Sequence, residues 1–263
     1  MKKKIMSLLL AATVIAGVLT GCGKSAAGSE SDLEYIKGKG TLIVGITDFA
    51  PMDYKDDSGK WIGFDADLAR EVAEDLGVEV EFTEIDWDNK ILELDNKSID
   101  VVWNGMTLTD EVASAMACTK PYLNNAQTVV VKAADASKYA TLEDIKGLKF
   151  AVEAGSAGES AAKDNGFEYT SVTSQADTLM EVEAGTSDAS IIDSLMAGAM
   201  VGEGTSYADL THTVDLTTEE YVVGCRKGSD LAAYIDEEIK KLTDDGTIKT
   251  IAEAYGVQEA LVK

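Results

Sequence analysis

Short apolar runs alternate with amphipathic stretches along most of the chain. Residues 41–46 (TLIVGI) form a β-branched run beside glycines, which predicts a buried strand. Apolar side chains then recur every four residues from Leu68 to Leu76. This spacing predicts a helix with Asp65 as its N-cap and Gly77 as its C-terminal stop. Two further strands and a second helix are predicted from the same patterns, at 78–83, 99–103 and 87–94.

The alternation of strands and helices restarts in the second half of the chain. Further strands are predicted at 149–152, 169–172 and 188–192, and further helices at 175–184 and after Glu159 and Ser194. Strands that alternate with helices favour a parallel, doubly wound α/β sheet, so we expect two such units. Two extended segments, 126–131 and 221–225, separate the units, and two helices, 230–243 and 247–255, close the chain. This order indicates a chain that leaves the first unit, builds the second and returns.

The composition is strongly acidic. The 263 residues include 47 Asp and Glu against 23 Lys and Arg, for a formal charge of −24. Nucleic-acid binding requires a basic stripe, so we expect no nucleic-acid partner and interpret the acid excess as a solubilising surface. His212 is the only histidine, and the sequence has neither a Cys/His cluster nor a G-x-S-x-G motif. We therefore expect no metal site, no cofactor and no hydrolase triad.

The N-terminus has the pattern of an export signal. Three lysines precede an apolar run at 5–20, which is too short for an ordinary membrane span, and small residues lead into Cys22. This resembles the cleavage box of bacterial lipoproteins. It predicts a signal peptide at 1–21, lipid acylation of Cys22 as a membrane anchor, and a flexible tether at 22–32. The remaining cysteines, Cys118 and Cys225, lie in apolar stretches and are expected to be buried free thiols.

Three polar segments follow predicted strands. Asn-Gly-Met-Thr at 104–107 ends an apolar run and leaves backbone polar groups unpaired for use by a ligand. Gly-Ser-Ala-Gly at 155–158 is either a tight turn or a helix N-terminus whose amides face an anionic group, and the pattern leaves both open. Asp193 ends an apolar strand. Because an unpaired acid is costly to bury, we expect a cationic ligand group against it.

Several motifs resemble those of the family 3 extracellular solute-binding proteins, which serve ABC importers of polar amino acids. The order and spacing match over residues 33–257 in six segments: 63–69 (GFDADLA), 85–88 (IDWD), 103–109 (WNGMTLT), 121–122 (PY), 152–155 (VEAG) and 244–247 (DDGT). The resemblance implies a two-lobed, periplasmic-binding-protein-like (type II) α/β fold, with two doubly wound sheets joined by two extended hinge strands. Lobe 1 would comprise 33–125 and 220–263, and lobe 2 would comprise 126–219.

The resemblance also implies site residues by position. In lobe 1, Phe49 would cover the ligand beside the Asp48 turn and Trp87 would form a wall, although either aromatic could instead be core packing. Gly105 would offer a backbone carbonyl and Thr107 a hydroxyl. The remaining implied ligand-binding residues are Asn104 at the strand end, Ser156, Ala157 and Gly158 in the loop that meets the carboxylate, and Asp193 for the α-ammonium group.

Two positions depart from the family pattern. Val112 stands where an arginine usually grips the α-carboxylate, and Ala157 stands where a hydroxyl residue is usual. Neither Arg70 nor Arg226 lies where it could substitute. Three outcomes stay open: backbone amides hold the carboxylate, Lys90 reaches in, or the ligand is an amine without an α-carboxylate. We expect an amino acid ahead of an amine.

The predicted function is a lipid-anchored, monomeric receptor that delivers a small-molecule ligand to ABC permease subunits, without enzymatic turnover. It would be exported and held at the outer face of the cell membrane, or lie in a periplasm. The alternative is an exported enzyme on the same scaffold, such as a cyclohexadienyl-dehydratase-like protein, with Asp48, Asp193 or another carboxyl in the cleft as general acid.

Overall fold

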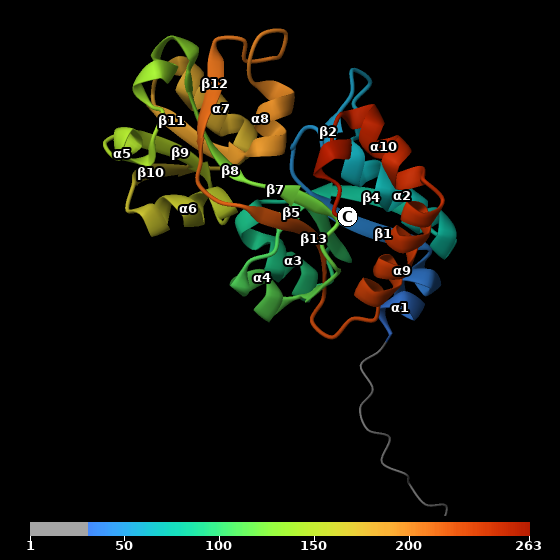
Figure 1. Cartoon of the computed structure of the whole chain (residues 1–263). Coiled ribbons are helices and arrows are strands. Elements are labelled where there is room, and N and C mark those ends of the chain that lie inside the picture. Colours follow the sequence, from blue (N-terminus) through green and yellow to red (C-terminus); the bar gives the residue numbers. More distant parts are fainter. Residues whose placement is uncertain (1–30) are drawn as a thin grey trace, which may run out of the picture.

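Two β-sheets, each flanked by helices, build two lobes in the computed structural model, which describes residues 31–263 (Figure 1). The chain passes between the sheets twice. The first passage runs from β7 (Leu123–Asn125) to β8 (Gln127–Lys132), and the second from β12 (Leu210–Asp215) to β13 (Glu219–Cys225). The two-lobed α/β prediction is therefore confirmed.

The first sheet has the strand order β4-β1-β5-β13-β6, and β7 also pairs with β13. Strand β1 (Thr41–Ile46) lies parallel to β4 (Glu79–Glu84) and β5 (Val101–Thr107). Strand β13, which returns from the second lobe, lies antiparallel to β5, β7 and β6 (Ala117–Cys118). The sheet is thus mixed rather than parallel throughout, because the returning strand enters it in the opposite direction.

The second sheet has the order β10-β9-β11-β8-β12. Strand β9 (Lys149–Glu153) is parallel to β10 (Glu168–Val172) and to β11 (Ala189–Asp193). Strand β8, which arrives from the first lobe, is antiparallel to β11 and β12. Here too the strands that cross between the lobes account for the mixed orientation. His212 lies on β12, the edge strand.

Most helices follow the predicted segments, but those at 32–39 and 110–115 were not predicted. In the first lobe they are α1 (Asp32–Lys39), α2 (Phe64–Leu76), α3 (Lys90–Asp95), α4 (Asp110–Ala115), α9 (Leu231–Asp244) and α10 (Thr247–Tyr255). In the second lobe they are α5 (Leu142–Ile145), α6 (Ala157–Asn165), α7 (Gln175–Ala184) and α8 (Ser194–Met200). A small hairpin, β2 (Tyr54–Lys55) and β3 (Trp61–Ile62), and 3₁₀ turns at Trp87–Asn89, Ala133–Lys138 and Gln258–Ala260 complete the fold. Among these described helices, none has the length and apolarity required to span a membrane.

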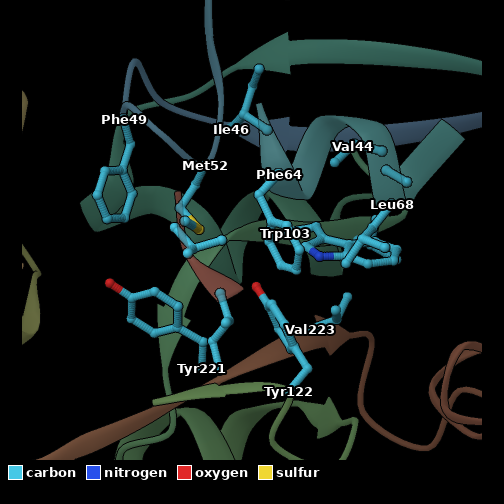
Figure 2. Close-up of a cluster of buried hydrophobic side chains, with 14 of the residues drawn as sticks. Val44, Ile46, Phe49, Met52, Phe64, Leu68, Trp103, Tyr122, Tyr221 and Val223 are labelled. Carbon is cyan, nitrogen blue, oxygen red and sulfur yellow. The ribbon is translucent and has the colours of Figure 1, made fainter. Parts of the chain in front are cut away.

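An aromatic cluster packs the first sheet against α2 (Figure 2). Trp103 is fully buried, and the rings of Phe64 and Tyr122 stack with centroids 6.2 Å apart. Phe49 meets Tyr221 edge to face at 6.4 Å. Each large apolar side chain buried in this way contributes about 1.5–3 kcal/mol, so the cluster holds β1, β5 and β13 in one rigid unit.

The prediction that Asp65 caps α2 is wrong. The N-cap is Gly63, whose φ of 132° and 2.1 Å approach to the carbonyl oxygen of Met52 exclude any side chain there. Asp65 instead points into the lobe, where it accepts hydrogen bonds from the Gly105 amide at 2.6 Å and from the Tyr122 hydroxyl at 2.8 Å. The carboxylate that the helical pattern assigned to a cap therefore holds a segment 40 residues away.

Strand β5 does not end at Trp103, as the break in its apolar run predicted, but continues to Thr107. Its register with β13 shifts between Val222 and Gly224, so that Trp103, Asn104 and Gly105 together oppose Val223. Such a bulge leaves backbone groups out of the ladder. The break in the apolar pattern therefore marks a bulge and not the end of the strand, and the Gly105 amide within it is bonded to Asp65. That backbone groups of this segment serve a ligand stays a prediction.

The predicted signal peptide, 1–21, and Cys22 lie outside the described residues. At the end of the predicted tether, Ser31 caps α1, and Asp32 forms a buried ion pair with Arg226 at 3.0 Å. These two residues therefore belong to the folded part and not to a linker. Cys118 and Cys225, the cysteines of the described part, are free, and only Cys225 is fully buried.

Candidate functional site

A cavity of about 40 Å³ lies between the lobes. Eight of the ten residues predicted to bind ligand line it: Phe49, Trp87, Asn104, Gly105, Thr107, Ser156, Ala157 and Asp193. The wall is completed by ten further residues: Thr47, Lys90, Met106, Thr109, Glu111, Val112, Glu153, Gly155, Ser160 and Gln175. A volume of this size admits a few water-sized groups, so the site suits a small molecule.

Phe49 and Gly105 form the first-lobe floor of the cavity. A Cβ atom at Gly105 would lie 2.5 Å from Cε1 of Phe49, and Gly105 has a φ of 53°. Both facts require glycine here. The aromatic ring therefore lies directly against the β5 bulge, and it is both packed in the core and exposed to the cavity. The two readings offered for Phe49 are not exclusive.

Asn104 lines the cavity, but its side chain is committed to the protein. Its Oδ1 accepts hydrogen bonds from the amide and hydroxyl of Thr47 at 3.0 and 2.8 Å. Its Nδ2 donates to the Thr47 carbonyl at 3.1 Å and to Asp53 at 2.8 Å. Burial beside the carboxylate of Asp65 raises the pKa of Asp53. Asn104 thus fixes the bulge and positions Gly105.

Asp193 ends β11 at the cavity and is 4% exposed. Its Oδ1 accepts hydrogen bonds from Asn125, from Gln127 at 3.0 Å and from the Tyr221 hydroxyl at 2.7 Å. Its Oδ2 accepts one from Gln175 at 2.5 Å. Among the described residues Oδ1 therefore has three donors and Oδ2 only one, so Oδ2 keeps a lone pair that can accept one more donor.

The network around Asp193 ties it to the strands that cross between the lobes. Glu219 accepts hydrogen bonds from the same amides of Asn125 and Gln127, at 2.6 and 2.7 Å, and from the Thr107 hydroxyl at 2.9 Å. Burial and the nearby Glu219 charge raise the pKa of Asp193 to about 8. A ligand cation would reverse this shift because it favours the ionised carboxylate.

Lys90 projects from α3 into the cavity and is 6% exposed. Its ammonium group donates to the carbonyl oxygens of Trp87 at 3.2 Å and of Gly155 at 2.9 Å, and it lies 5.0 Å from the centroid of the Trp87 ring. The bond to Gly155 crosses from the first lobe to the second. Burial lowers the pKa of Lys90. With three N–H donors, the ammonium keeps one for a ligand.

The loop 155–158 leads into α6 from the second lobe. Ser156 caps this helix by accepting from the amide of Glu159 at 3.0 Å, so its hydroxyl is used within the protein. The amides of Ala157 and Gly158 are first-turn groups, which have no acceptor inside a helix. Gly158 lies behind the cavity wall, where a Cβ would come 2.8 Å from the carbonyl oxygen of Ile191. Glycine at 158 thus allows α6 to approach β11 closely.

Val112 lies in the cavity wall, whereas Asp48, a predicted ligand-binding residue, does not. Val112 lines the cavity and packs with Trp87, Met106 and Met116 in an apolar cluster, so an apolar wall occupies the position where the family usually places an arginine. Asp48 is exposed and lies outside the residues that form the cavity wall.

Arg226 is held by Asp32 and Asp100, and Arg70 by Asp67. Both arginines are thus engaged away from the cavity wall, as the sequence reading expected.

The sequence reading missed three buried polar residues of the cavity, Thr47, Glu153 and Gln175. Gln175 opens α7 and bonds both the carboxylate and the backbone amide of Asp193, the latter at 2.9 Å. Glu153 is the last residue of β9, the strand beside β11. Its position at the carboxyl end of a strand was the available signal, because such ends meet at the ligand site of an α/β sheet.

Comparison with known proteins is consistent with this geometry. The model for the bacterial extracellular solute-binding proteins, family 3, matches residues 42–258. The arginine-binding extracellular protein ArtP of Bacillus subtilis is 32% identical over 257 residues, which cover 94% of this chain and 96% of ArtP.

Two solved structures share the type II fold. A mutant of the arginine-binding protein ArgBP from T. maritima has a TM-score of 0.79 and 32% identity, over 85% of this chain and 98% of its own. The ancestral amino acid-binding protein AncCDT-1, a precursor of cyclohexadienyl dehydratase, also has a TM-score of 0.79. It is 33% identical and covers 86% of this chain and 99% of its own. The predicted fold class is confirmed by these relatives.

Proposed function

Because the chain belongs to the family 3 bacterial extracellular solute-binding proteins, we propose that it is the substrate-binding protein of an ABC importer. It captures a polar amino acid or a related small amine when the two lobes close. The observation that carries this proposal is Asp193, a buried carboxylate with one acceptor site left in a small cavity between the lobes. We propose the lobe boundaries as 33–125 with 220–263, and 126–219.

The α-ammonium group of the ligand binds Oδ2 of Asp193. On the opposite lobe, the same ammonium group donates to the carbonyl of Gly105 and to the hydroxyl oxygen of Thr107. The Thr107 hydroxyl can accept because its own proton is donated to Glu219. Phe49 and Trp87 exclude water from the ligand. A charge-assisted hydrogen bond in such a site contributes about 1.5–3 kcal/mol.

Lys90 and the amide of Ala157, which both line the cavity, replace the missing arginine in binding the carboxylate. The ammonium of Lys90 already touches the loop through Gly155, so a carboxylate between them would bridge the lobes. A ligand held in this way stabilises the closed form, which the permease then recognises. An amine without a carboxylate would bind through Asp193 alone.

The same proposal includes the predicted processing. Cleavage before Cys22 and acylation of its thiol would anchor the receptor at the outer face of the membrane, where it acts as a monomer beside the permease subunits. Mass spectrometry of the protein purified from a bacterial membrane tests this, because acyl chains on Cys22 add a defined mass that a Cys22→Ser variant lacks.

The test of the function is a binding screen. We expect one or more of the twenty amino acids, or a small amine, to bind in isothermal titration calorimetry and to quench or shift the fluorescence of Trp87. Asp209→Asn, an exposed acid of the second lobe, is the matched control for variants of the cavity. A protein that binds no amino acid and no amine would contradict the proposal.

A second candidate function is a dehydratase on the same scaffold. It is favoured by the raised pKa values of the cavity carboxyls, which suit a general acid, and by the similarity to AncCDT-1. Recovery of an unchanged ligand, measured by mass spectrometry after long incubation with the protein, supports the receptor. Loss of water from the ligand supports the enzyme.

A further inference from the structure

Glu153 is a buried carboxyl of the cavity that nothing in the proposed function uses. It ends β9, lines the cavity and is 2% exposed. Within residues 31–263, its Oε1 has no hydrogen-bonding partner. An unpaired polar atom of this kind is costly to bury, so its retention at a ligand site points to a partner that the protein does not supply.

The contrast with Asp193 on the neighbouring strand is informative. Four protein donors, from Asn125, Gln127, Gln175 and Tyr221, meet the carboxylate of Asp193. The two acids end adjacent parallel strands, which lie about 4.8 Å apart, so the protein has stabilised one of them and left the other open.

The charged and polar groups around Glu153 do not neutralise it. Lys90 on α3 bonds two carbonyl oxygens, and it forms no ion pair with Glu153 in the described part of the chain. On α7, Gln175 is bound to Asp193, and Asp177 adds negative charge; on α6, Glu159 pairs with Lys163 at 2.9 Å. Burial, and then the charge of Asp193, raise the pKa of Glu153 to about 8, and neither the opposing charge of Lys90 nor the nearby side-chain amide of Gln175 cancels this rise.

We propose that Glu153 is a second cation-binding group of the cleft, which accepts a hydrogen bond from a positively charged amino or guanidino group on the side chain of the ligand. This proposal rests on the proposed function, in which Asp193 binds the first amino group. The ligand is then a molecule with two cationic nitrogen groups.

The charges of the buried side chains narrow the class of ligand further. When ionised, the buried residues of the cavity wall contribute two negative charges, from Asp193 and Glu153, and one positive charge, from Lys90; the third acid of the wall, Glu111, is exposed to solvent. An amino acid with a cationic side chain carries the complement, two positive groups and one carboxylate. A diamine would pair both acids but leave Lys90 without an anion. The geometry therefore favours a basic amino acid over a diamine.

Capture of such a ligand also displaces protons. Near neutral pH the buried acids hold protons when the cavity has no ligand, and a ligand cation can replace a proton at each carboxyl. A ligand with a neutral side chain would leave the proton on Glu153 in place. Proton release on binding therefore distinguishes a carboxyl that meets the ligand from one that is only structural.

The experiment compares ligands that differ only in the second charge: L-lysine with L-norleucine, L-arginine with L-citrulline, and 1,4-diaminobutane with butylamine. In isothermal titration we expect the charged member of at least one amino-acid pair to bind about 10- to 100-fold tighter than its neutral analogue. Glu153→Gln should abolish that preference and reduce the number of protons released, measured in buffers of different ionisation enthalpy. Glu168→Gln, an exposed acid at the start of the adjacent strand β10, is the matched control and should change neither.

The outcomes separate the two proposals. If a neutral amino acid binds as tightly as its charged analogue, or if Glu153→Gln keeps the preference and the proton release, the role of Glu153 is wrong while the receptor function stands. If the wild-type protein binds none of these probes and none of the twenty amino acids, the proposed function itself fails. Tighter binding of the diamine than of either basic amino acid would overturn the charge count. Should Glu153→Gln fold poorly, Glu153→Asp carries the test, since its shorter carboxylate should weaken only the charged ligands.

Discussion

Replacing Asp193 by Asn tests the site most directly, because the change keeps the shape of the side chain and removes one charge. In the wild-type protein Oδ1 accepts three hydrogen bonds, so the amide oxygen of Asn is expected to take that position. The new NH₂ group then occupies the place of Oδ2. There it faces the donor Nε2 of Gln175 and the ammonium of the ligand, so two favourable contacts become unfavourable.

The magnitude follows from the bond that is lost. A hydrogen bond to a charged group contributes about 1.5–3 kcal/mol, and each 1.4 kcal/mol is a factor of ten in Kd. We therefore expect Asp193→Asn to raise the Kd of the ligand by about 10- to 150-fold. The ligand-free protein should not be destabilised in proportion, because with a pKa of about 8 Asp193 is mostly protonated there near neutral pH, and Asn is also uncharged.

The assay is isothermal titration of the ligand found in the screen, with thermal unfolding of the ligand-free variant as a check on folding. Asp209→Asn is the control, since it removes the same charge from the surface of the same lobe. An unchanged Kd in a well-folded Asp193→Asn protein would refute the reasoning, because the ammonium group could then not be bound by this carboxylate.

Three further predictions test other parts of the site. Gly105→Ala should lower stability by roughly 1–3 kcal/mol in urea unfolding and weaken ligand binding, because its Cβ would collide with Phe49; an equally stable protein would contradict the bulge geometry. Lys90→Gln should weaken an amino acid more than its carboxamide analogue in titration, and equal losses would exclude Lys90 as the carboxylate partner. Stability of the ligand-free protein should fall as pH rises from about 5 to about 8, by up to about 1.4 kcal/mol per pH unit for each acid. Stability falls because Asp193 and Glu153, with pKa values of about 8, keep protons in the folded state that the unfolded chain has already released. In Glu153→Gln, the free energy of unfolding measured in urea should therefore change less between pH 6, 7 and 8 than in the wild-type protein.

The pattern of apolar and polar residues was sufficient for the order of elements and for the neighbourhood of the site. Helices such as α7 and α10 begin and end where their stripes and turn residues predict. Residues at the carboxyl ends of strands, among them Thr107 and Asp193, do meet in one cavity. Periodicity has this power because it reports which face of an element is buried, and because parallel strands bring their ends to one edge.

What the pattern could not reveal is the partner of each buried polar group. Asp65 was assigned to a cap and Asn104 to the ligand, yet one holds Gly105 and the other holds Thr47 and Asp53. Glu153 gave no signal apart from its place at the end of a strand. Each of these roles depends on a hydrogen-bonding atom that another part of the chain brings within about 3 Å, or, for Glu153, on the lack of one in residues 31–263.

By itself the sequence determined two α/β units, the chain passages between them and a site where they meet. Only the tertiary structure decided which carboxyls of that site are already satisfied and which remain open to a ligand. The physical reason is that burial of apolar surface is encoded locally along each element, whereas a hydrogen bond requires two groups, and their meeting is settled only when the sheets and lobes assemble.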